Sequence, residues 1–167
     1  MIGTLTVNNI WLDCYLLLII LILCGFAVYD IQNKRVPNRA LIFFLPVAMM
    51  APIVMSLTKG EFSINITSLL HNALFAVFGA LLGGGILLLA GLISGGGIGG
   101  GDIKLTAILG FIYGPFGITG MLLVAAPVAM IYSTIRKKQP KGDNLRLAFV
   151  PHILLGSLSI TAIKLFI

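Results

Sequence analysis

Apolar residues recur along the chain in long runs that short polar or glycine- and proline-containing stretches separate. Most of these runs approach the ~20 residues that an α-helix needs to cross a bilayer. Breaks in the pattern such as Val36-Pro37-Asn38 and Gly114-Pro115 are typical of helix ends. The pattern predicts an all-α, polytopic transmembrane helix bundle that uses residues 1–167 as one domain. The six predicted segments are Trp11–Tyr29, Ala40–Leu57, Leu69–Ile93, Ile103–Tyr113, Phe116–Ile135 and Leu147–Phe166.

The composition excludes an ordinary soluble domain. Only 10% of the residues are charged and the mean hydropathy is +1.10, whereas soluble domains carry about 25% charged residues. A net charge of +6 could suggest nucleic acid as a partner, but in a membrane protein it more often reflects basic cytoplasmic loops. We therefore expect membrane lipid around the bundle and no nucleic acid.

The basic residues also predict an orientation. Nine of the 11 Lys and Arg residues lie in connections after odd-numbered segments, and only Lys59 and Lys164 lie on the other side. The positive-inside rule then places the connections that carry these nine residues in the cytoplasm and both termini outside.

The fourth segment is too short to span. Its eleven residues would cover about 17 Å, against a hydrocarbon core of roughly 30 Å. Either Pro115 interrupts one longer tilted helix, or the preceding glycine-rich run, residues 95–101, dips into the membrane to meet a short helix. We favour the second reading, because glycine permits tight loops and the close approach of an extended substrate.

Of the five acidic residues, only two lie at helix ends on the same predicted membrane face. Asp30 closes the first segment and Asp102 follows the glycine run. Acids at this depth are costly and suggest function, and two neighbouring carboxylates can act together as general base and general acid. Each also has a simpler reading. Asp102 could cap a helix, and Asp30 could be a juxtamembrane charge beside Lys34.

At these residues the sequence resembles the type IV prepilin peptidases, a family of GxGD aspartic proteases. Asp30 with the following Val36-Pro37-Asn38 is similar to the first aspartate motif of that family, and Gly99-Gly100-Gly101-Asp102-Ile103-Lys104 to its GxGD motif. The segment Leu147–Gly156 is similar to the closing segment of the family. The similarity covers almost the whole chain in order and spacing.

The resemblance implies an aspartic endopeptidase (a hydrolase) that removes the short basic leader from prepilin or pseudopilin substrates, each a leader joined to a hydrophobic helix. The site would face the cytoplasm, in the cytoplasmic (inner) membrane of the cell. Asp30 and Asp102 would be catalytic, with no cofactor and no metal. A homo-oligomer is left open. The residues that would shape the site are Gly99, Gly101, Lys104, Pro37, Asn38 and Pro151.

Two features depart from the family pattern. Only nine residues separate Asp30 from the second segment, and they hold none of the paired CxxC motifs that many bacterial members carry in an additional cytoplasmic domain. We therefore expect a short form without the N-terminal methylase domain, in which methyl transfer is in doubt. His152 stands where an aromatic Phe is usual; it would be either a third catalytic group or, more often for such a residue, a packing one.

Three other readings of the same residues stay open. Presenilin-like proteases also combine Tyr29-Asp30 with GxGD, but they have more spanning segments and lack the Val36-Pro37-Asn38 turn. A small transporter or channel could use the two aspartates to bind a proton or cation. The basic stretch Arg136–Arg146 could instead belong to an assembly factor that contacts anionic lipid or an acidic partner.

Overall fold

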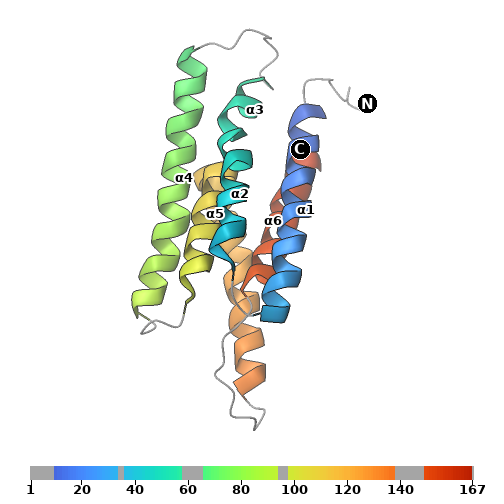
Figure 1. The fold of residues 1–167 in the computed structure, drawn as a ribbon, viewed down its shortest axis with the longest axis vertical. Coiled ribbons are helices and arrows are strands. Elements are labelled where there is room, and N and C mark those ends of the chain that lie inside the picture. The colour runs from blue at the N-terminus through green and yellow to red at the C-terminus, as the bar shows by residue number, and fades with distance from the viewer. Residues whose placement is uncertain (1–9, 34–35, 58–65, 94–97, 138–148, 167) are drawn as a thin grey trace.

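The computed structural model describes residues 10–33, 36–57, 66–93, 98–137 and 149–166, and all the regular structure in these ranges is helical. The helices lie side by side along the long axis of the molecule (Figure 1). This arrangement confirms the predicted all-α class. The helices are α1 Ile10–Asn33, α2 Asn38–Met49, α3 Ala51–Leu57, α4 Ile66–Ile93, α5 Gly100–Lys137 and α6 Val150–Phe166.

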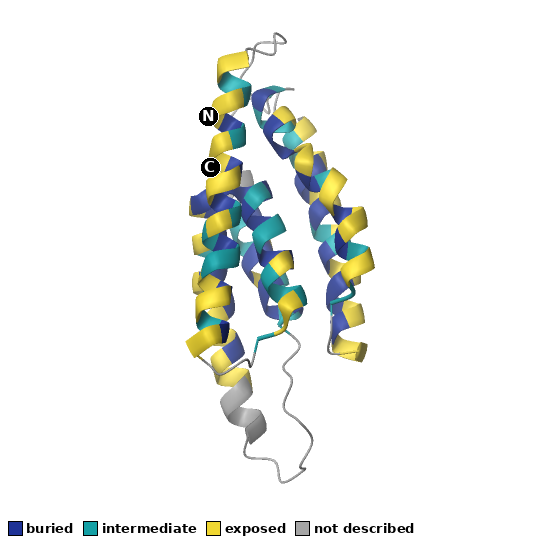
Figure 2. Ribbon diagram, turned by 60° about the vertical axis from the view of Figure 1, so that its left-hand side comes forward, coloured by how far each residue is buried: buried dark blue, intermediate teal, exposed yellow. Residues whose placement is uncertain are grey.

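Four stretches of the described chain are long and apolar enough to cross a membrane: Trp11–Asn33, Asn38–Leu57, Ile66–Ile93 and Gly100–Tyr132. The apolar part of α6, Val150–Ile163, is shorter. Exposed residues cover the outward faces of the helices and buried residues lie between them (Figure 2), and many exposed side chains are large and apolar. Such an outer surface suits lipid. The count of six spans stays a prediction.

The chain reverses direction inside α5. Gly114 has φ 71° and ψ 179°, which is not helical and which favours glycine. Pro115 follows it, where the missing backbone N–H costs nothing at the start of a new helical arm. A Cβ placed on Gly83 of α4 would lie 2.6 Å from the carbonyl oxygen of Thr106 and 2.9 Å from Ile118, so the two arms run back past the same point of α4 (Figure 1).

This reversal accounts for the short fourth segment. The first arm, residues 100–113, is about 21 Å long at 1.5 Å per residue, and the second arm, residues 115–137, forms the predicted fifth segment. The turn therefore falls at the predicted break Gly114-Pro115. Residues 94–97 of the glycine run lie outside the described residues, so the predicted loop before this arm remains a prediction.

Glycines hold α4 and α5 close together. Gly79 on α4 lies against the backbone of Gly110 and Gly114 on α5, so that a Cβ at Gly79 or Gly110 would overlap the other helix. Small residues spaced four apart let membrane helices approach in this way. The arm that carries Asp102 is thus fixed against α4, while its other side contributes Leu105, Leu109 and Ile112 to the core.

Candidate active site

Asp30 is buried at the lower end of the bundle in Figure 1, where α1 ends and α6 begins. Its side chain is only 2% exposed. The carboxylate oxygen Oδ2 accepts a hydrogen bond of 3.0 Å from the backbone N–H of Val150, and the carboxylate also accepts one from the N–H of Phe149. Asp30 therefore lies buried within α1, and not in a loop as its simpler reading would place it.

The start of α6 is built to receive this carboxylate. A helix begins with N–H groups that have no partner within the helix, and these form a positive end. Asp30 takes the N–H groups of Phe149 and Val150, while Pro151 has none to satisfy. The next two N–H groups, of His152 and Ile153, bind the carbonyl of Phe149 at 3.1 and 3.3 Å. Pro151, a predicted site residue, therefore sits in the turn that holds Asp30.

Asp102 lies in the first turn of α5. Its carboxylate accepts a hydrogen bond from the N–H of Gly99, and the Gly99 carbonyl accepts bonds from the N–H groups of Asp102 and Ile103 at 3.0 and 3.3 Å. This exchange between a helix-capping residue and the side chain three positions on is one half of a capping box. Asp102 thus has the capping role that its sequence position allowed.

Asp102 also has an interaction beyond capping. Its carboxyl group interacts electrostatically with that of Asp30, so the pair links α5 and α1. Asp102 is half-buried, whereas Asp30 is closed off. Two carboxyl groups in this relation cannot both ionise cheaply, so they can hold one proton between them. In a pair that shares one proton, one group can accept a proton while the other donates one.

The α1–α2 connection packs onto the start of α5. A Cβ on Gly101 would lie 2.9 Å from both the Cβ and the carbonyl oxygen of Val36, whereas a Cβ on Gly100 would meet nothing within 4 Å. Pro37 then caps α2 with extended backbone, φ −73° and ψ 127°. Gly101 is thus a point of close contact in the structure; its predicted role in shaping a path for substrate stays a prediction.

Lys104 and Asn38 join the same two helices at the surface. The Lys104 Nζ donates a hydrogen bond of 3.2 Å to Asn38 Oδ1. Both side chains are exposed. The structure therefore brings four of the predicted site-shaping residues, Pro37, Asn38, Gly101 and Lys104, to the contact between α2 and α5, beside the turn that carries Asp102.

His152 has a buried place next to Asp30. It is 8% exposed, its ring centroid lies 5.6 Å from that of Tyr132 on α5, and it interacts electrostatically with Asp30. Its ring thus fills space between α5 and α6 as the aromatic residue expected there would, and it also contributes to the field around the carboxylate.

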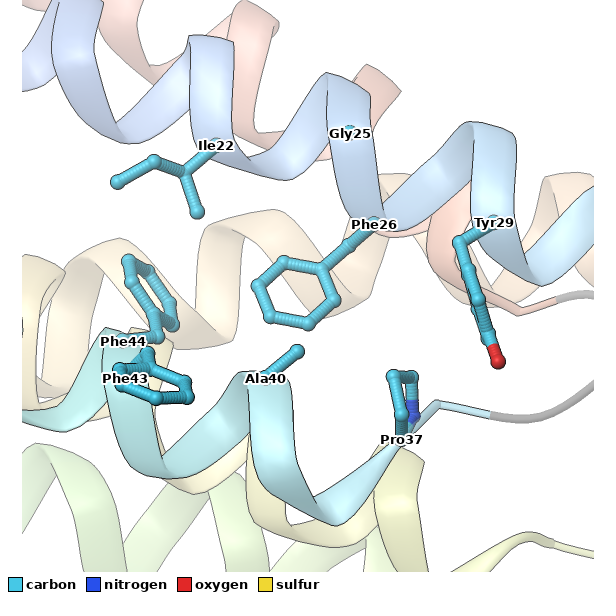
Figure 3. A pocket seen from close by; sticks show the side chains of 8 residues that line it. All are labelled: Ile22, Gly25, Phe26, Tyr29, Pro37, Ala40, Phe43 and Phe44. Atoms are coloured by element: carbon cyan, nitrogen blue, oxygen red, sulfur yellow. The ribbon is translucent and has the colours of Figure 1, made fainter.

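Sequence reasoning missed an apolar groove between α1 and α2, called here the α1–α2 groove. Its volume is about 420 Å³. The spacing of Ile22, Phe26 and Asp30, each four residues after the last, places them on one face of α1 and was a signal that could have found it. Figure 3 shows the lining residues Ile22, Gly25, Phe26, Tyr29, Pro37, Ala40, Phe43 and Phe44.

Within the described residues, no three His, Cys, Asp or Glu side chains gather in a way that could hold a metal ion. Cys14 and Cys24 are exposed and carry no disulfide. The carboxyl pair is therefore the cluster in the described residues to which we assign chemistry.

The sequence was compared with known protein families and with individual proteins to find its family. Residues 15–134 match the model of the type IV leader peptidase family. A protein of Bacillus subtilis (strain 168) named prepilin leader peptidase/N-methyltransferase is 32% identical over 139 residues, which is 79% of this chain and 48% of that protein. The chain thus spans about half the length of this curated relative. No solved structure matches the chain. Since the family model covers most of the chain, including both Asp30 and Asp102, the chain belongs to the type IV leader peptidase family.

Proposed function

We propose that this protein is a membrane-embedded aspartic endopeptidase in which Asp30 and Asp102 activate one water molecule to cleave a peptide bond. The observation that carries the proposal is the relation of the two carboxyl groups: they come from different helices, α1 and α5, and interact electrostatically. Membership of a leader peptidase family supports the same chemistry.

In the proposed reaction the ionised carboxylate takes a proton from the water molecule while the oxygen of that water attacks the scissile carbonyl carbon. The protonated partner hydrogen-bonds the carbonyl oxygen, and a proton then passes to the leaving nitrogen as the C–N bond breaks. One proton is taken from water and one is given to the amine, so the pair returns to its starting state. Asp30 is suited to this work because two backbone N–H groups fix its position.

The proposed substrates are prepilin-like proteins, from which the enzyme would remove a short basic leader. The name of the Bacillus subtilis relative supports this substrate class. That name also includes N-methyltransferase; the present proposal is confined to cleavage, which is what two carboxyl groups can carry out.

We further propose a multi-pass protein of the cytoplasmic membrane with the carboxyl pair facing the cytoplasm and both ends of the chain outside. The support is the one-sided distribution of Lys and Arg described above. Asp30, Asp102 and the described basic residues Arg39 and Lys104 all belong to the end of the bundle that this assignment places inside.

The test is co-expression with candidate prepilins, with loss of the leader scored by mass spectrometry. Cleavage is expected with the native chain and not with Asp102→Asn at matched expression. If the native chain cleaves none of them but the purified protein in liposomes carries a proton or cation flux that Asp102→Asn removes, the two aspartates serve transport and the peptidase proposal fails.

A further inference from the structure

The α1–α2 groove is a cavity in the outer wall of the bundle. In Figure 3 the rings of Phe26 and Phe44 project into the space between the two helices. These rings lie 5.7 Å apart at 55° and both side chains are buried, so they close the groove toward the bundle interior. With a volume of about 420 Å³, the groove falls in the range of roughly 300–1,000 Å³ that is usual for ligand pockets.

The other side of the groove is open. Phe43 is 81% exposed, and a Cβ placed on Gly25 would meet nothing within 4 Å. Because Ile22 to Tyr29 and Ala40 to Phe44 belong to stretches that can span a membrane, this opening faces the apolar layer. A ligand would therefore enter sideways from the membrane.

One end of the groove lies next to Asp30 along α1. Tyr29 and Pro37 lie at one end of the groove (Figure 3). Asp30 directly follows Tyr29 in the chain and lies one turn after Phe26 on the same face of α1. Pro37 directly precedes Asn38, whose Oδ1 accepts a hydrogen bond from Lys104 in the first turn of α5, two residues after Asp102. The groove thus leads along α1 toward the site for about 10 Å, the length of Ile22 to Tyr29 at 1.5 Å per residue.

The lining indicates what can bind. Apart from the Tyr29 hydroxyl, the eight side chains are apolar, and none carries a charge. A charged or strongly polar segment would lose its hydration there without gaining a partner. The groove is therefore suited to aliphatic or aromatic side chains.

We propose that the α1–α2 groove binds the apolar helix of the substrate, through the side chains that directly follow the scissile bond. This inference rests on the proposed function. A substrate with a polar leader and an apolar helix has its cleavage point where the two meet. With that point held at Asp30 and Asp102, the helix must continue into the membrane, and the groove provides a surface that begins beside Asp30 and opens to lipid. The leader would lie on the opposite side of the carboxyl pair, at the polar end of the bundle.

The first test is a substitution that fills the α1–α2 groove without overlapping other atoms of the protein. Gly25→Leu places an apolar side chain in open space, and Gly85→Leu on α4 is its matched control, since a Cβ there also meets nothing within 4 Å. With a full-length substrate in detergent or liposomes, Gly25→Leu should raise KM by about tenfold, as blocked apolar contacts do, and leave kcat unchanged. Gly85→Leu should change neither.

Photo-crosslinking gives a second measurement that does not depend on turnover. A photoreactive phenylalanine at Phe43 should crosslink to the apolar helix of the substrate, whereas one at Phe116, which is equally exposed at 81%, should not. Unchanged KM in Gly25→Leu, or crosslinks from Phe43 to lipid alone, would overturn the groove proposal while leaving the peptidase proposal intact. Failure of the native chain to cleave any prepilin would reject both.

Discussion

The carboxylate of Asp30 binds the backbone N–H of Val150 at 3.0 Å, across 120 residues of sequence. This bond joins the last turns of α1 to the first turn of α6 and gives a buried charge the positive end of a helix as its partner. The same bond fixes one of the two groups to which we assign catalysis, so stability and chemistry meet in one side chain.

The first prediction concerns the carboxyl pair. Asp30→Asn and Asp102→Asn keep the size of the side chain but remove its capacity to exchange a proton, so each should lower cleavage by about 10²–10⁴-fold. The double variant should be no worse than the slower single one, because groups that act as a unit are not additive. Leader cleavage and the amount of membrane-inserted protein are measured side by side. Normal cleavage by purified Asp30→Asn would mean that Asp30 serves the helix cap alone.

The second prediction is a dependence of rate on pH at both ends. At low pH both carboxyl groups are protonated and no base remains; at high pH both are ionised and no acid remains. The rate at saturating substrate should therefore pass through a maximum, and its two limbs belong to the pair and not to either residue. A rate that levels off at high pH without a second limb would contradict the need for a protonated partner.

The third prediction separates two neighbouring glycines. Gly101→Ala forces a methyl group against Val36 and should lower the free energy of unfolding by about 1–3 kcal/mol, as overpacking does. Gly100→Ala enters open space and should change it by less than about 1 kcal/mol. Thermal unfolding in detergent measures both. Equal behaviour of the two variants would show that the contact between Gly101 and Val36 is unimportant.

The fourth prediction concerns His152. His152→Phe keeps a ring against Tyr132 and leaves the backbone cap on Asp30 untouched, so the free energy of unfolding should stay within about 1.5 kcal/mol and cleavage should persist. His152→Ala opens a cavity and should cost about 2–5 kcal/mol. If His152→Phe folds normally but no longer cleaves, the imidazole takes part in the chemistry and the packing interpretation fails.

The fifth prediction tests orientation. In a variant whose exposed Cys14 and Cys24 are replaced by serine, single cysteines at Arg39 and Ile66 mark the starts of α2 and α4, at opposite ends of the bundle (Figure 1). A membrane-impermeant thiol reagent should reach the Ile66→Cys site from outside in intact cells and the Arg39→Cys site only after lysis. The reverse pattern would place the carboxyl pair outside.

The helices could be predicted because the length of an apolar run can be read directly from neighbouring residues. Each predicted segment is largely helical, although Ala40–Leu57 is divided between α2 and α3, and the break at Gly114-Pro115 falls where α5 turns. That this break is a reversal and not a kink depends on Gly79 and Gly83 of α4, which let both arms pack beside them. Glycines spaced four apart, such as Gly79 and Gly83, mark a face that can pack closely, but the spacing does not say which helix packs against that face.

The acidic side chains of the candidate site could be predicted from the sequence, but the backbone groups that bind them could not. Asp30 and Asp102 stand out as acids in an apolar chain, but the partners of Asp30 are N–H groups, which every residue other than proline possesses. Glycine is ambiguous for a related reason: Gly100 faces open space and Gly101 faces Val36, although the sequence around them is the same. The α1–α2 groove was not predicted because its two walls come from different helices, and the spacing of residues along α1 indicates only one of them.

The bond from Asp30 to the start of α6 has a consequence for how the protein is made. A ribosome that has completed α1 through α5 has supplied both carboxyl groups, yet the N–H groups that hold Asp30 do not exist until Phe149 and Val150 have been added. Until α6 inserts, Asp30 lacks the hydrogen bonds from Phe149 and Val150 that fix its orientation. In the proposed mechanism, the catalytic geometry of Asp30 therefore forms only when α6 docks, so a chain that still lacks α6 would not yet cleave a substrate.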